Sequence, residues 1–422
     1  MIEREALKED SMKYIVILCD GMADEPIDAL GGRTPIEAAR TENMDRLAKD
    51  AEIGVVRTVP EGMTPGSDTA NLSVIGYDPK KYYSGRSPLE ALSIGAKMED
   101  GDVSFRCNLV TLSESETDYE DRVILDHSSG EISTAEAAEL LEALKEGLKK
   151  DGYTFYAGTS YRHLLIQKDG KTMDLTAPHD ILEKCIGEYL PKDEVLRDMM
   201  VRSYDILKDH PINKKRRAEG KNPANSAWFW GAGTRPALTS FEEKNGVKGA
   251  MISAVDLLKG IAVGAGMHNI MVEGANGGLH TNYSGKASAA VKALNEDGYD
   301  FVYVHIEAPD EMGHQGSMED KIKAIEYIDE KIIGPVADAL HDSGADFRML
   351  ILPDHPTPIR VRTHTSDPVP YLLYDSTKKT DGPGFYSEKA GRDSGRYIEE
   401  GWRLMEHFIP VSYTHLRAHE TL

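Results

Sequence analysis

One apolar run ends in an Asp-His pair and constrains the fold more than any other stretch. Residues 349–352 read Met-Leu-Ile-Leu and lead through Pro353 into Asp354 and His355. An uninterrupted apolar run of this length predicts a strand buried on both faces, as in a parallel sheet covered by helices. In open α/β sheets, ligand-binding residues follow the carboxyl ends of the strands. The Asp354–His355 pair is therefore placed for chemistry.

Two further apolar runs deliver acidic residues in the same way. Residues 14–19 end at Asp20, and residues 301–306 lead to Asp310 and, four positions later, His314. On a helical turn that spacing puts both side chains on one face. A single aspartate after a strand is most simply a helix cap or a turn residue. Three such strand ends, two of them carrying histidine, predict a site for a hard or borderline divalent metal.

The order of the expected elements predicts an α/β chain of two domains. Alternation of strands and helices in residues 14–100 returns from residue 249, and antiparallel-type strands interrupt it between the two. We expect a mostly parallel sheet with helices on both faces, interrupted by a smaller α+β domain. The expected boundaries are residues 12–99 plus 241–409 for the discontinuous metal-binding domain, 100–240 for the inserted substrate-binding or lid domain, and 1–11 and 410–422 for non-core tails.

The charge balance excludes some classes of partner. The 422 residues include 49 Lys and Arg against 71 Asp and Glu, for a formal net charge of −22. That balance argues against nucleic acid or an anionic membrane as a partner, but a local basic pocket can still bind a small anionic substrate. Three widely spaced cysteines, no signal-peptide pattern and no apolar run of about 20 residues fit a reduced cytoplasmic chain. A homo-oligomer is compatible with the sequence.

The candidate nucleophile is Ser67, in the run Thr-Pro-Gly-Ser-Asp-Thr. It lies in a loop rich in Gly and Pro just before an expected helix, where backbone N–H groups can hold an anion. A plain helix N-cap explains the same serine equally well. A metal that lowers the pKa of the hydroxyl would make it a nucleophile. His364, in Arg-Thr-His-Thr, is a further candidate ligand.

Taken in order, these motifs resemble the alkaline phosphatase superfamily and, more closely, the cofactor-independent phosphoglycerate mutases of the archaeal type. The resemblance spans about residues 12–409 and implies an alkaline-phosphatase-like fold. It also implies interconversion of 3-phosphoglycerate and 2-phosphoglycerate through a phosphoserine, in glycolysis and gluconeogenesis, without 2,3-bisphosphoglycerate. The matching runs are CDGMADEP at 19–26, TPGSDTANLSVIGYDP at 64–79, YSGRSPLEA at 83–91, HIEAPDEMGH at 305–314 and LPDHPTPI at 352–359.

The resemblance also implies a role for each candidate residue. Ser67 corresponds to the serine that accepts the phosphoryl group. Two divalent ions are implied, manganese first, with zinc, cobalt or magnesium as alternatives. The implied ligands are Asp20, Ser67, Asp354 and His355 for one ion, and Asp310, His314 and His364 for the other.

The expected substrate contacts are basic residues of the inserted domain, since the substrate is a small phosphorylated anion. Each of these residues also has an explanation that involves no ligand. The basic run 214–217, for example, also fits an ordinary solvent-exposed helix or loop surface. Other functions stay open, namely a homoserine kinase-like phosphotransferase of the same family, a metal-dependent phosphatase, and a regulatory or scaffold protein. The absence of a Walker A sequence disfavours the use of ATP. The expected contacts are Arg106, His127, Arg162, Arg216 and Arg217.

Overall fold

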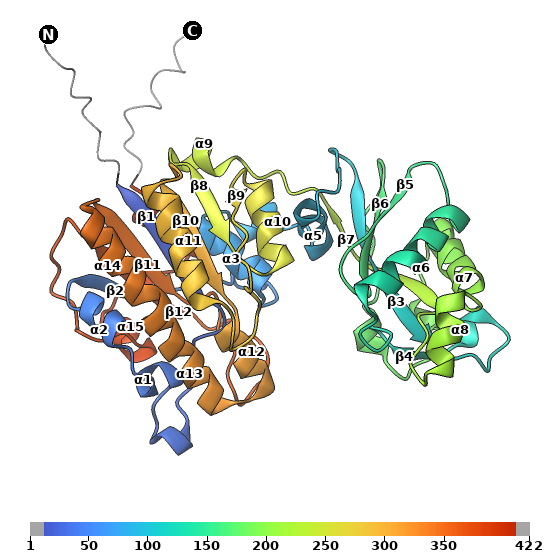
Figure 1. Cartoon of the computed structure of the whole chain (residues 1–422), viewed down its shortest axis with the longest axis horizontal. Coiled ribbons are helices and arrows are strands. Elements are labelled where there is room, and N and C mark those ends of the chain that lie inside the picture. The colour runs from blue at the N-terminus through green and yellow to red at the C-terminus, as the bar shows by residue number, and fades with distance from the viewer. Residues whose placement is uncertain (1–11, 411–422) are drawn as a thin grey trace, which may run out of the picture. The chain divides into compact units, whose positions relative to one another are not determined.

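The structure, a computed structural model, describes residues 12–410. Of the tails expected at residues 1–11 and 410–422, all but residue 410 lie outside the described residues. The chain forms two compact units: one combines the described residues before Ser84 with those after Pro236, and the other is Ser84–Pro236 (Figure 1). The second unit includes helix α5 (Arg86–Ser93), which lies outside the expected inserted domain of residues 100–240.

The first unit is built on a sheet whose central strands are buried. Its strand order is β13-β2-β12-β11-β1-β10-β8-β9. The bounds are β1 (Lys13–Cys19), β2 (Ala51–Val56), β8 (Gly249–Ile252), β9 (His268–Asn269), β10 (Phe301–Ile306), β11 (Phe347–Leu352), β12 (Val369–Asp375) and β13 (Tyr397–Ile398). Only β12 runs antiparallel to its neighbours, β11 and β2, among the described strands of this sheet. The mostly parallel sheet that the apolar runs predict is confirmed.

Helices cover both faces of this sheet. They are α1 (Pro35–Ala38), α2 (Glu42–Ala48), α3 (Ser67–Ile75), α4 (Pro79–Tyr82), α9 (Phe241–Asn245), α10 (Asp256–Gly264), α11 (Tyr283–Asn295), α12 (Ala308–Gln315), α13 (Met318–Ile328), α14 (Gly334–Ser343), α15 (Glu388–Asp393) and α16 (Leu404–Phe408). Because side chains alternate along a strand, Ile15 and Ile17 of β1 join a core with α2, α11, α13 and α14. From the opposite face of β1, Tyr14 packs edge-on against Phe408 of α16 at a centroid distance of 5.6 Å.

Local sequence signals explain where several helices begin. Thr34 and Glu37 form a capping box at the start of α1, with Pro35 in the first turn as expected. The long helix expected at residues 318–340 consists of α13 and α14, joined through a π-helical turn at Asp329–Ile333. None of the described helices is long and apolar enough to cross a membrane.

The second unit is a smaller α+β structure. Its antiparallel sheet has the order β4-β3-β6-β5, and β7 pairs with β3 (Figure 1). Its elements are β3 (Val103–Leu112), β4 (Ile124–Asp126), β5 (Tyr153–Tyr156), β6 (Arg162–Gln167), β7 (Ser226–Thr234), α6 (Thr134–Gly147), α7 (Glu194–Leu207) and α8 (Pro211–Ala218), besides α5. The sequence predicts a basic loop at residues 213–220, and this prediction is wrong for residues 213–218, which are helical because Pro211 opens α8 behind a capping His210.

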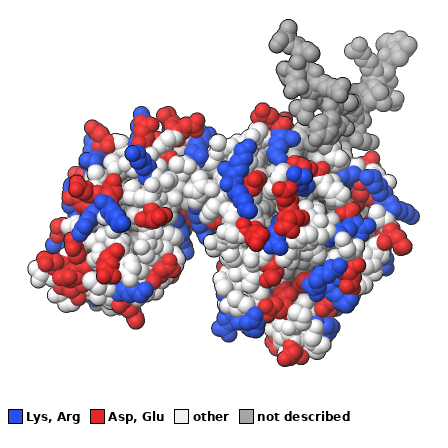
Figure 2. All heavy atoms as spheres, turned by 180° about the vertical axis from the view of Figure 1, so that it is seen from behind, with Lys and Arg blue, Asp and Glu red and all other residues white. Residues whose placement is uncertain are grey.

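The acidic excess does not form one continuous patch on the face in Figure 2. Red Asp and Glu side chains alternate there with blue Lys and Arg side chains. Several charged side chains of the described residues form ion pairs with a partner three or four residues away on the same helix, such as Lys145 with Glu142 and Lys389 with Asp393. Exposed pairs of this kind contribute little to stability, about 0.3–0.5 kcal/mol each.

Candidate metal and nucleophile centre

The candidate ligands converge because three adjacent strands of the first sheet end together. In the register of the sheet, Cys19 of β1 lies beside Ile306 of β10, and Leu18 lies beside Leu352 of β11. The residues that follow these strands therefore leave the sheet at one edge. This edge carries Asp20 after β1, Asp310 and His314 after β10, and Asp354, His355 and His364 after β11.

Asp20 is one of three buried acids at this edge, together with Asp310 and Asp354. Its side chain is buried, its Oδ2 lies 2.9 Å from Nε2 of His305, and its Oδ1 has no hydrogen-bond partner among the described residues. Burial first, and then the neighbouring charges of Asp354 and Asp310, raise the pKa of Asp20 well above its usual range. An unpaired oxygen among buried acids is what a bound cation would satisfy.

Ser67 occupies the first position of α3, next to this acid. Its Oγ lies 3.3 Å from Nε2 of His355 and 3.5 Å from Oδ2 of Asp20. Gly66 holds the N-cap position, and no side chain caps the helix there. The alternative reading of Ser67 as a plain N-cap therefore does not describe this helix. The hydroxyl instead points toward the candidate ligands.

A second set of ligand atoms gathers around Asp310. Nε2 of His314 lies 3.2 Å from one carboxylate oxygen, and Nε2 of His364 lies 3.4 Å from the other. The two Nε2 atoms are only 3.0 Å apart, so at most one of them carries a proton comfortably. Nδ1 of His314 lies 3.0 Å from the carbonyl oxygen of Arg362, an arrangement that favours a proton on Nδ1 and leaves Nε2 for a metal.

The acid–base balance of this set depends on its mutual hydrogen bonds. Burial alone would raise the pKa of Asp310, but its contacts with the imidazoles of His314 and His364, which can share one proton with it, hold the pKa well below its usual range. The hydrogen bond to Asp310 raises the pKa of His314 to about 9. Both shifts reflect one shared interaction between an anion and imidazole rings, and a bound cation would take the place of the shared proton.

In the part of the chain that the structure describes, two groups of three residues have ligand atoms within 4.8 Å of one another: Asp310 with His314 and His364, and Asp20 with Asp310 and His355. The expected division assigned Asp310 to one ion only. Asp354, expected beside Asp20 and His355, is adjacent to the second group, with Oδ2 lying 3.4 Å from Nε2 of His355. Carboxylates and imidazoles in this arrangement fit divalent cations such as manganese or zinc.

Further residues that sequence reasoning missed hold the acids in place. Asn71, one helical turn after Ser67, donates from Nδ2 to Oδ2 of Asp354 at 2.9 Å and to the Ser67 carbonyl at 2.8 Å. The hydroxyl of Tyr303 donates to Oδ1 of Asn71, which fixes the orientation of the amide. Thr357 donates its hydroxyl to Oδ1 of Asp310. The only sequence signal for Asn71 was its spacing of four residues from Ser67.

The five expected substrate contacts fall into two sets in the second unit. Arg106 stacks over Trp230 at 4.2 Å, and Arg162 stacks over Tyr161 at 4.2 Å. The ring of His127 packs edge-on against Tyr161 at 5.8 Å. His179 packs against both His127 and Trp230, so these three expected contacts belong to one aromatic cluster. Arg162 has no ion pair among the described residues, whereas Arg106 pairs with Glu90 at 3.0 Å.

Arg216 and Arg217 of α8 form the other set, and both guanidinium groups are already engaged. Arg216 is 2% exposed, pairs with Glu136 at 2.8 Å, and donates to the carbonyl oxygens of Ser129 and Asn222. Arg217 forms a two-pronged pair with Glu114. Among the described residues, the hydrogen bonds and ion pairs of Arg216 and Arg217 go to groups other than the rings of the aromatic cluster. Their partners suit a structural role within the unit.

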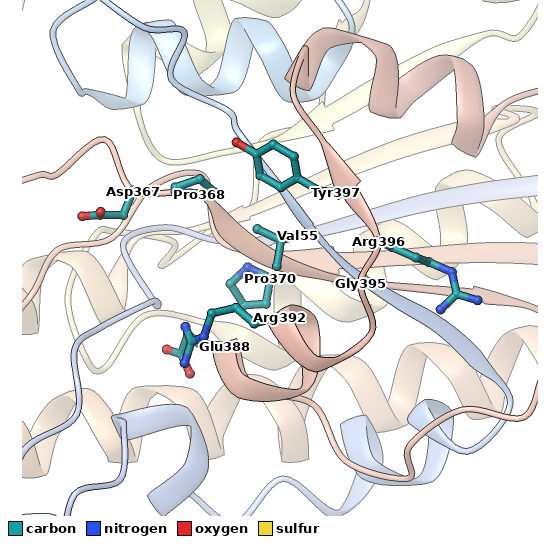
Figure 3. A pocket seen from close by; sticks show the side chains of 9 residues that line it. All are labelled: Val55, Asp367, Pro368, Pro370, Glu388, Arg392, Gly395, Arg396 and Tyr397. Carbon is teal, nitrogen blue, oxygen red and sulfur yellow. The ribbon is translucent and has the colours of Figure 1, made fainter.

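A cavity of about 420 Å³ lies elsewhere in the first unit, beside β2, β12 and β13 (Figure 3). Its wall includes the buried Glu388, whose oxygens accept hydrogen bonds from the hydroxyl of Thr34 at 2.7 Å and the N–H of Asp24 at 3.1 Å. Burial raises the pKa of Glu388 to about 7. None of the candidate ligands lines this cavity, so it is distinct from the centre described above.

Comparisons with known proteins agree with this picture. A family model described as 2,3-bisphosphoglycerate-independent phosphoglycerate mutase matches residues 48–213. A 2,3-bisphosphoglycerate-independent phosphoglycerate mutase of Methanothrix thermoacetophila is 47% identical, over 94% of this chain and 100% of its own length. A solved structure of a Pyrococcus horikoshii protein is 31% identical with a TM-score of 0.78, covering 95% of this chain and 98% of its own.

A solved cofactor-independent phosphoglycerate mutase of Thermoplasma acidophilum is 29% identical with a TM-score of 0.65, covering 94% of this chain and 99% of its own. The fold therefore defines an α/β protein of the cofactor-independent phosphoglycerate mutase class. The chain belongs to the family of 2,3-bisphosphoglycerate-independent phosphoglycerate mutases. The resemblance and the fold class expected from the motifs are both confirmed.

Proposed function

We propose that this protein interconverts 3-phosphoglycerate and 2-phosphoglycerate without 2,3-bisphosphoglycerate, in cytoplasmic glycolysis and gluconeogenesis. The observation that carries the proposal is the position of Ser67, whose Oγ lies 3.3 Å from His355 and 3.5 Å from Asp20 among the candidate ligands. The name of the Methanothrix relative, 47% identical over nearly the whole chain, supports the same reaction.

Seven residues of the first unit would hold two divalent ions, and manganese is the ion that we expect first. When bound, such ions lower the pKa of a coordinated hydroxyl and neutralise phosphate oxygens. The donor set supports this assignment, because it combines three buried carboxylates with three imidazoles and leaves Oδ1 of Asp20 without a partner. The residues are Asp20, Ser67, Asp354 and His355 for one ion, and Asp310, His314 and His364 for the other.

The reaction proceeds by two transfers at Ser67. In the first, the Ser67 hydroxyl loses its proton, the Oγ–P bond forms, the bond from phosphorus to the C3 oxygen of 3-phosphoglycerate breaks, and that oxygen gains a proton. In the second, the C2 hydroxyl loses its proton, its oxygen bonds to the phosphorus of the phosphoserine, the Oγ–P bond breaks, and Oγ regains a proton. Such transfers require alignment and charge neutralisation more than covalent chemistry from the protein. Glycerate has to stay bound between the two steps.

For the glycerate carboxylate we propose Arg162, supported by Arg106 and His127, as the binding residues of the second unit. Arg162 is exposed and has no ion pair among the described residues, so its guanidinium can bind an anion without breaking a contact. Guanidinium groups bind carboxylates in a two-pronged way, which fixes the orientation of the ligand. Arg216 and Arg217 lack this freedom.

The test is direct turnover of 3-phosphoglycerate by the purified full chain with manganese, in the absence of ATP and 2,3-bisphosphoglycerate. We expect 2-phosphoglycerate to form and the reaction to reverse from added 2-phosphoglycerate. Release of inorganic phosphate alone would indicate a phosphatase. No conversion, together with ATP-dependent phosphorylation of homoserine, would replace the proposal with the kinase-like alternative.

A further inference from the structure

His305 lies one residue before the carboxyl end of the buried strand β10, and its ring contacts residues that follow the two neighbouring strands. Its Nε2 lies 2.9 Å from Oδ2 of Asp20, which follows β1. Its Nδ1 lies 3.2 Å from Oγ of Ser253, which follows β8. Both strands flank β10 directly in the sheet, and His305 is fully buried. A row of three polar side chains thus crosses an otherwise apolar layer and ends at a candidate metal ligand.

The backbone at Ser253 sets the direction of the hydrogen bonds in this row. The N–H of Val255 donates to Oγ of Ser253 at 3.0 Å. With that oxygen acting as an acceptor, the hydroxyl hydrogen of Ser253 is free to point at Nδ1 of His305. A ring that accepts at Nδ1 carries its proton on Nε2. Nε2–H then donates to the carboxylate of Asp20.

The opposite tautomer gives a poor arrangement. It would place the lone pair of Nε2 against Oδ2 of Asp20 at 2.9 Å, with no hydrogen between them unless the acid were protonated. A buried pair of acceptors without a donor is costly. Lys286 further holds this strand, since its buried ammonium group donates to the carbonyl oxygen of His305 at 2.8 Å. The geometry therefore selects one tautomer and one ring position.

We propose that His305 is a positioning residue: held in its Nε2–H tautomer by Ser253, it fixes Oδ2 of Asp20 so that Oδ1 is presented to a bound cation. Within residues 12–410, Oδ1 has no hydrogen-bond partner, and it lies 3.6 Å from Nε2 of His355, a neighbouring candidate ligand. Partners that orient a ligating carboxylate typically change metal affinity by 10–100-fold when they are removed. The inference rests on the proposed metal centre but not on the identity of the substrate.

The first test measures the tautomer in the metal-free full chain. Nitrogen-15 NMR of histidine-labelled protein distinguishes a protonated from an unprotonated ring nitrogen, and the His305→Gln spectrum assigns the signal. We expect His305 to carry its proton on Nε2, and Ser253→Ala to shift or broaden the Nδ1 resonance. A proton that stays on Nδ1 of wild-type His305 once Asp20 is ionised, as the carbon-13 shift of the Asp20 carboxyl group shows, would overturn the proposal. This measurement requires neither bound metal nor enzyme turnover.

The second test compares two substitutions at the same position. His305→Gln keeps an N–H donor near the place of Nε2, whereas His305→Leu removes the donor and keeps a similar volume. Manganese affinity is measured from the paramagnetic resonance signal of free manganese. We expect His305→Leu to weaken manganese binding at the site that includes Asp20 by about 10–100-fold. We expect His305→Gln to keep most of the wild-type affinity.

Controls separate this effect from a general loss of structure. His163 is also a buried histidine, but it lies in the second unit, where its Nδ1 accepts only a backbone N–H. His163→Gln should leave the manganese affinity unchanged. If His305→Leu fails to fold, Ser253→Ala takes its place, with an expected loss of about 3–10-fold in affinity. The proposal would be overturned if the wild type, His305→Gln and His305→Leu bound manganese with equal affinity. It would also be overturned if both substitutions at residue 305 lowered the affinity equally.

If manganese binds and the tautomer is as expected, but no 2-phosphoglycerate forms, then the proposed reaction fails while the role of His305 stands. If turnover is normal and both residue-305 variants bind manganese like the wild type, then only the inference about His305 fails. The two outcomes are thus distinguishable.

Discussion

Ser67 and His355 lie 288 residues apart in the chain, yet Oγ of one is 3.3 Å from Nε2 of the other. The contact forms because α3 begins at Ser67 just where β11 delivers His355 to the same edge of the sheet. A hydroxyl that meets a buried imidazole and a buried carboxylate is a suitable nucleophile once a cation lowers its pKa. The predictions below follow from this arrangement.

Replacing Ser67 by alanine should lower mutase turnover by at least about 10⁴-fold, because the group that accepts the phosphoryl is lost. Manganese should still bind, since six candidate ligands remain. Ser73→Ala is the matched control: Ser73 is a fully buried serine of the same helix whose hydroxyl has no partner among the described residues, so turnover should be unchanged. Recovery of labelled phosphate on a different residue of the wild-type enzyme would refute the assignment.

Removing metal should abolish turnover and lower thermal stability together. Manganese at about 100 times its Kd should stabilise the folded chain by about 2.7 kcal/mol, which corresponds to several degrees in Tm. His364→Ala should lose more than half of that shift, because the imidazole beside Asp310 and His314 is missing. His341→Ala, a surface histidine of α14, should keep it. Full activity after chelation and dialysis would exclude the metal mechanism.

Neutralising Arg162 should impair use of the substrate far more than neutralising Arg217. A charge-assisted hydrogen bond contributes about 1.5–3 kcal/mol, so Arg162→Gln should reduce kcat/KM for 3-phosphoglycerate by about 10-fold or more. Arg217→Gln should stay within about 2-fold, since that guanidinium is paired with Glu114 on the surface. If Arg217→Gln lowered kcat/KM more than Arg162→Gln did, the result would instead favour Arg217 as the substrate contact.

The second unit should lose stability in mild acid through His163. Burial first, with Lys145 adding to it, lowers the pKa of His163 to about 4, and its Nε2 has no partner among the described residues. Between pH 6.5 and about 4 the unfolded chain binds a proton that the folded chain does not. Stability therefore falls as the pH falls through this window, by up to about 3 kcal/mol.

Urea unfolding at pH 7.5 and pH 5, followed by tryptophan fluorescence, measures this loss. Trp228 and Trp230 of β7 report on the second unit. His163→Gln keeps an acceptor for the N–H of Gly158 but does not titrate, so it should lose less stability than the wild type on acidification. An identical pH dependence of both proteins would contradict the assignment.

The ligand-bearing strand ends could be predicted because their signals are local. An apolar run followed by an acid specifies both a buried strand and the place where its ligand emerges, and Asp20, Asp310 and Asp354 lie there. The fate of a charged side chain is not local. Arg216 pairs with Glu136, which is 80 residues away in the chain, and no pattern within α8 indicates that contact. The role of this basic run in binding the substrate therefore stays a prediction, which the pairing of Arg216 disfavours.

Strand β7 and the partners of the acids were missed for a similar reason. The run Ser226–Thr234 contains two glycines, and its pairing with β3 is a long-range feature that periodicity does not reveal. His305 was recognisable only as a polar residue in an apolar strand, compatible with a satisfied core histidine. Its role depends on Ser253 and Asp20, which the sheet brings together from three separate parts of the chain.

The most direct test of the central claim is phosphorus-31 NMR of the full chain with manganese and 3-phosphoglycerate in water enriched in oxygen-18, without ATP and without 2,3-bisphosphoglycerate. Transfer through Ser67 brings no water oxygen into the phosphoryl group. We therefore predict that 2-phosphoglycerate accumulates without an oxygen-18 shift, and that Ser67→Ala gives no product. Inorganic phosphate carrying oxygen-18 as the main product, or no reaction until ATP is added, would contradict the account.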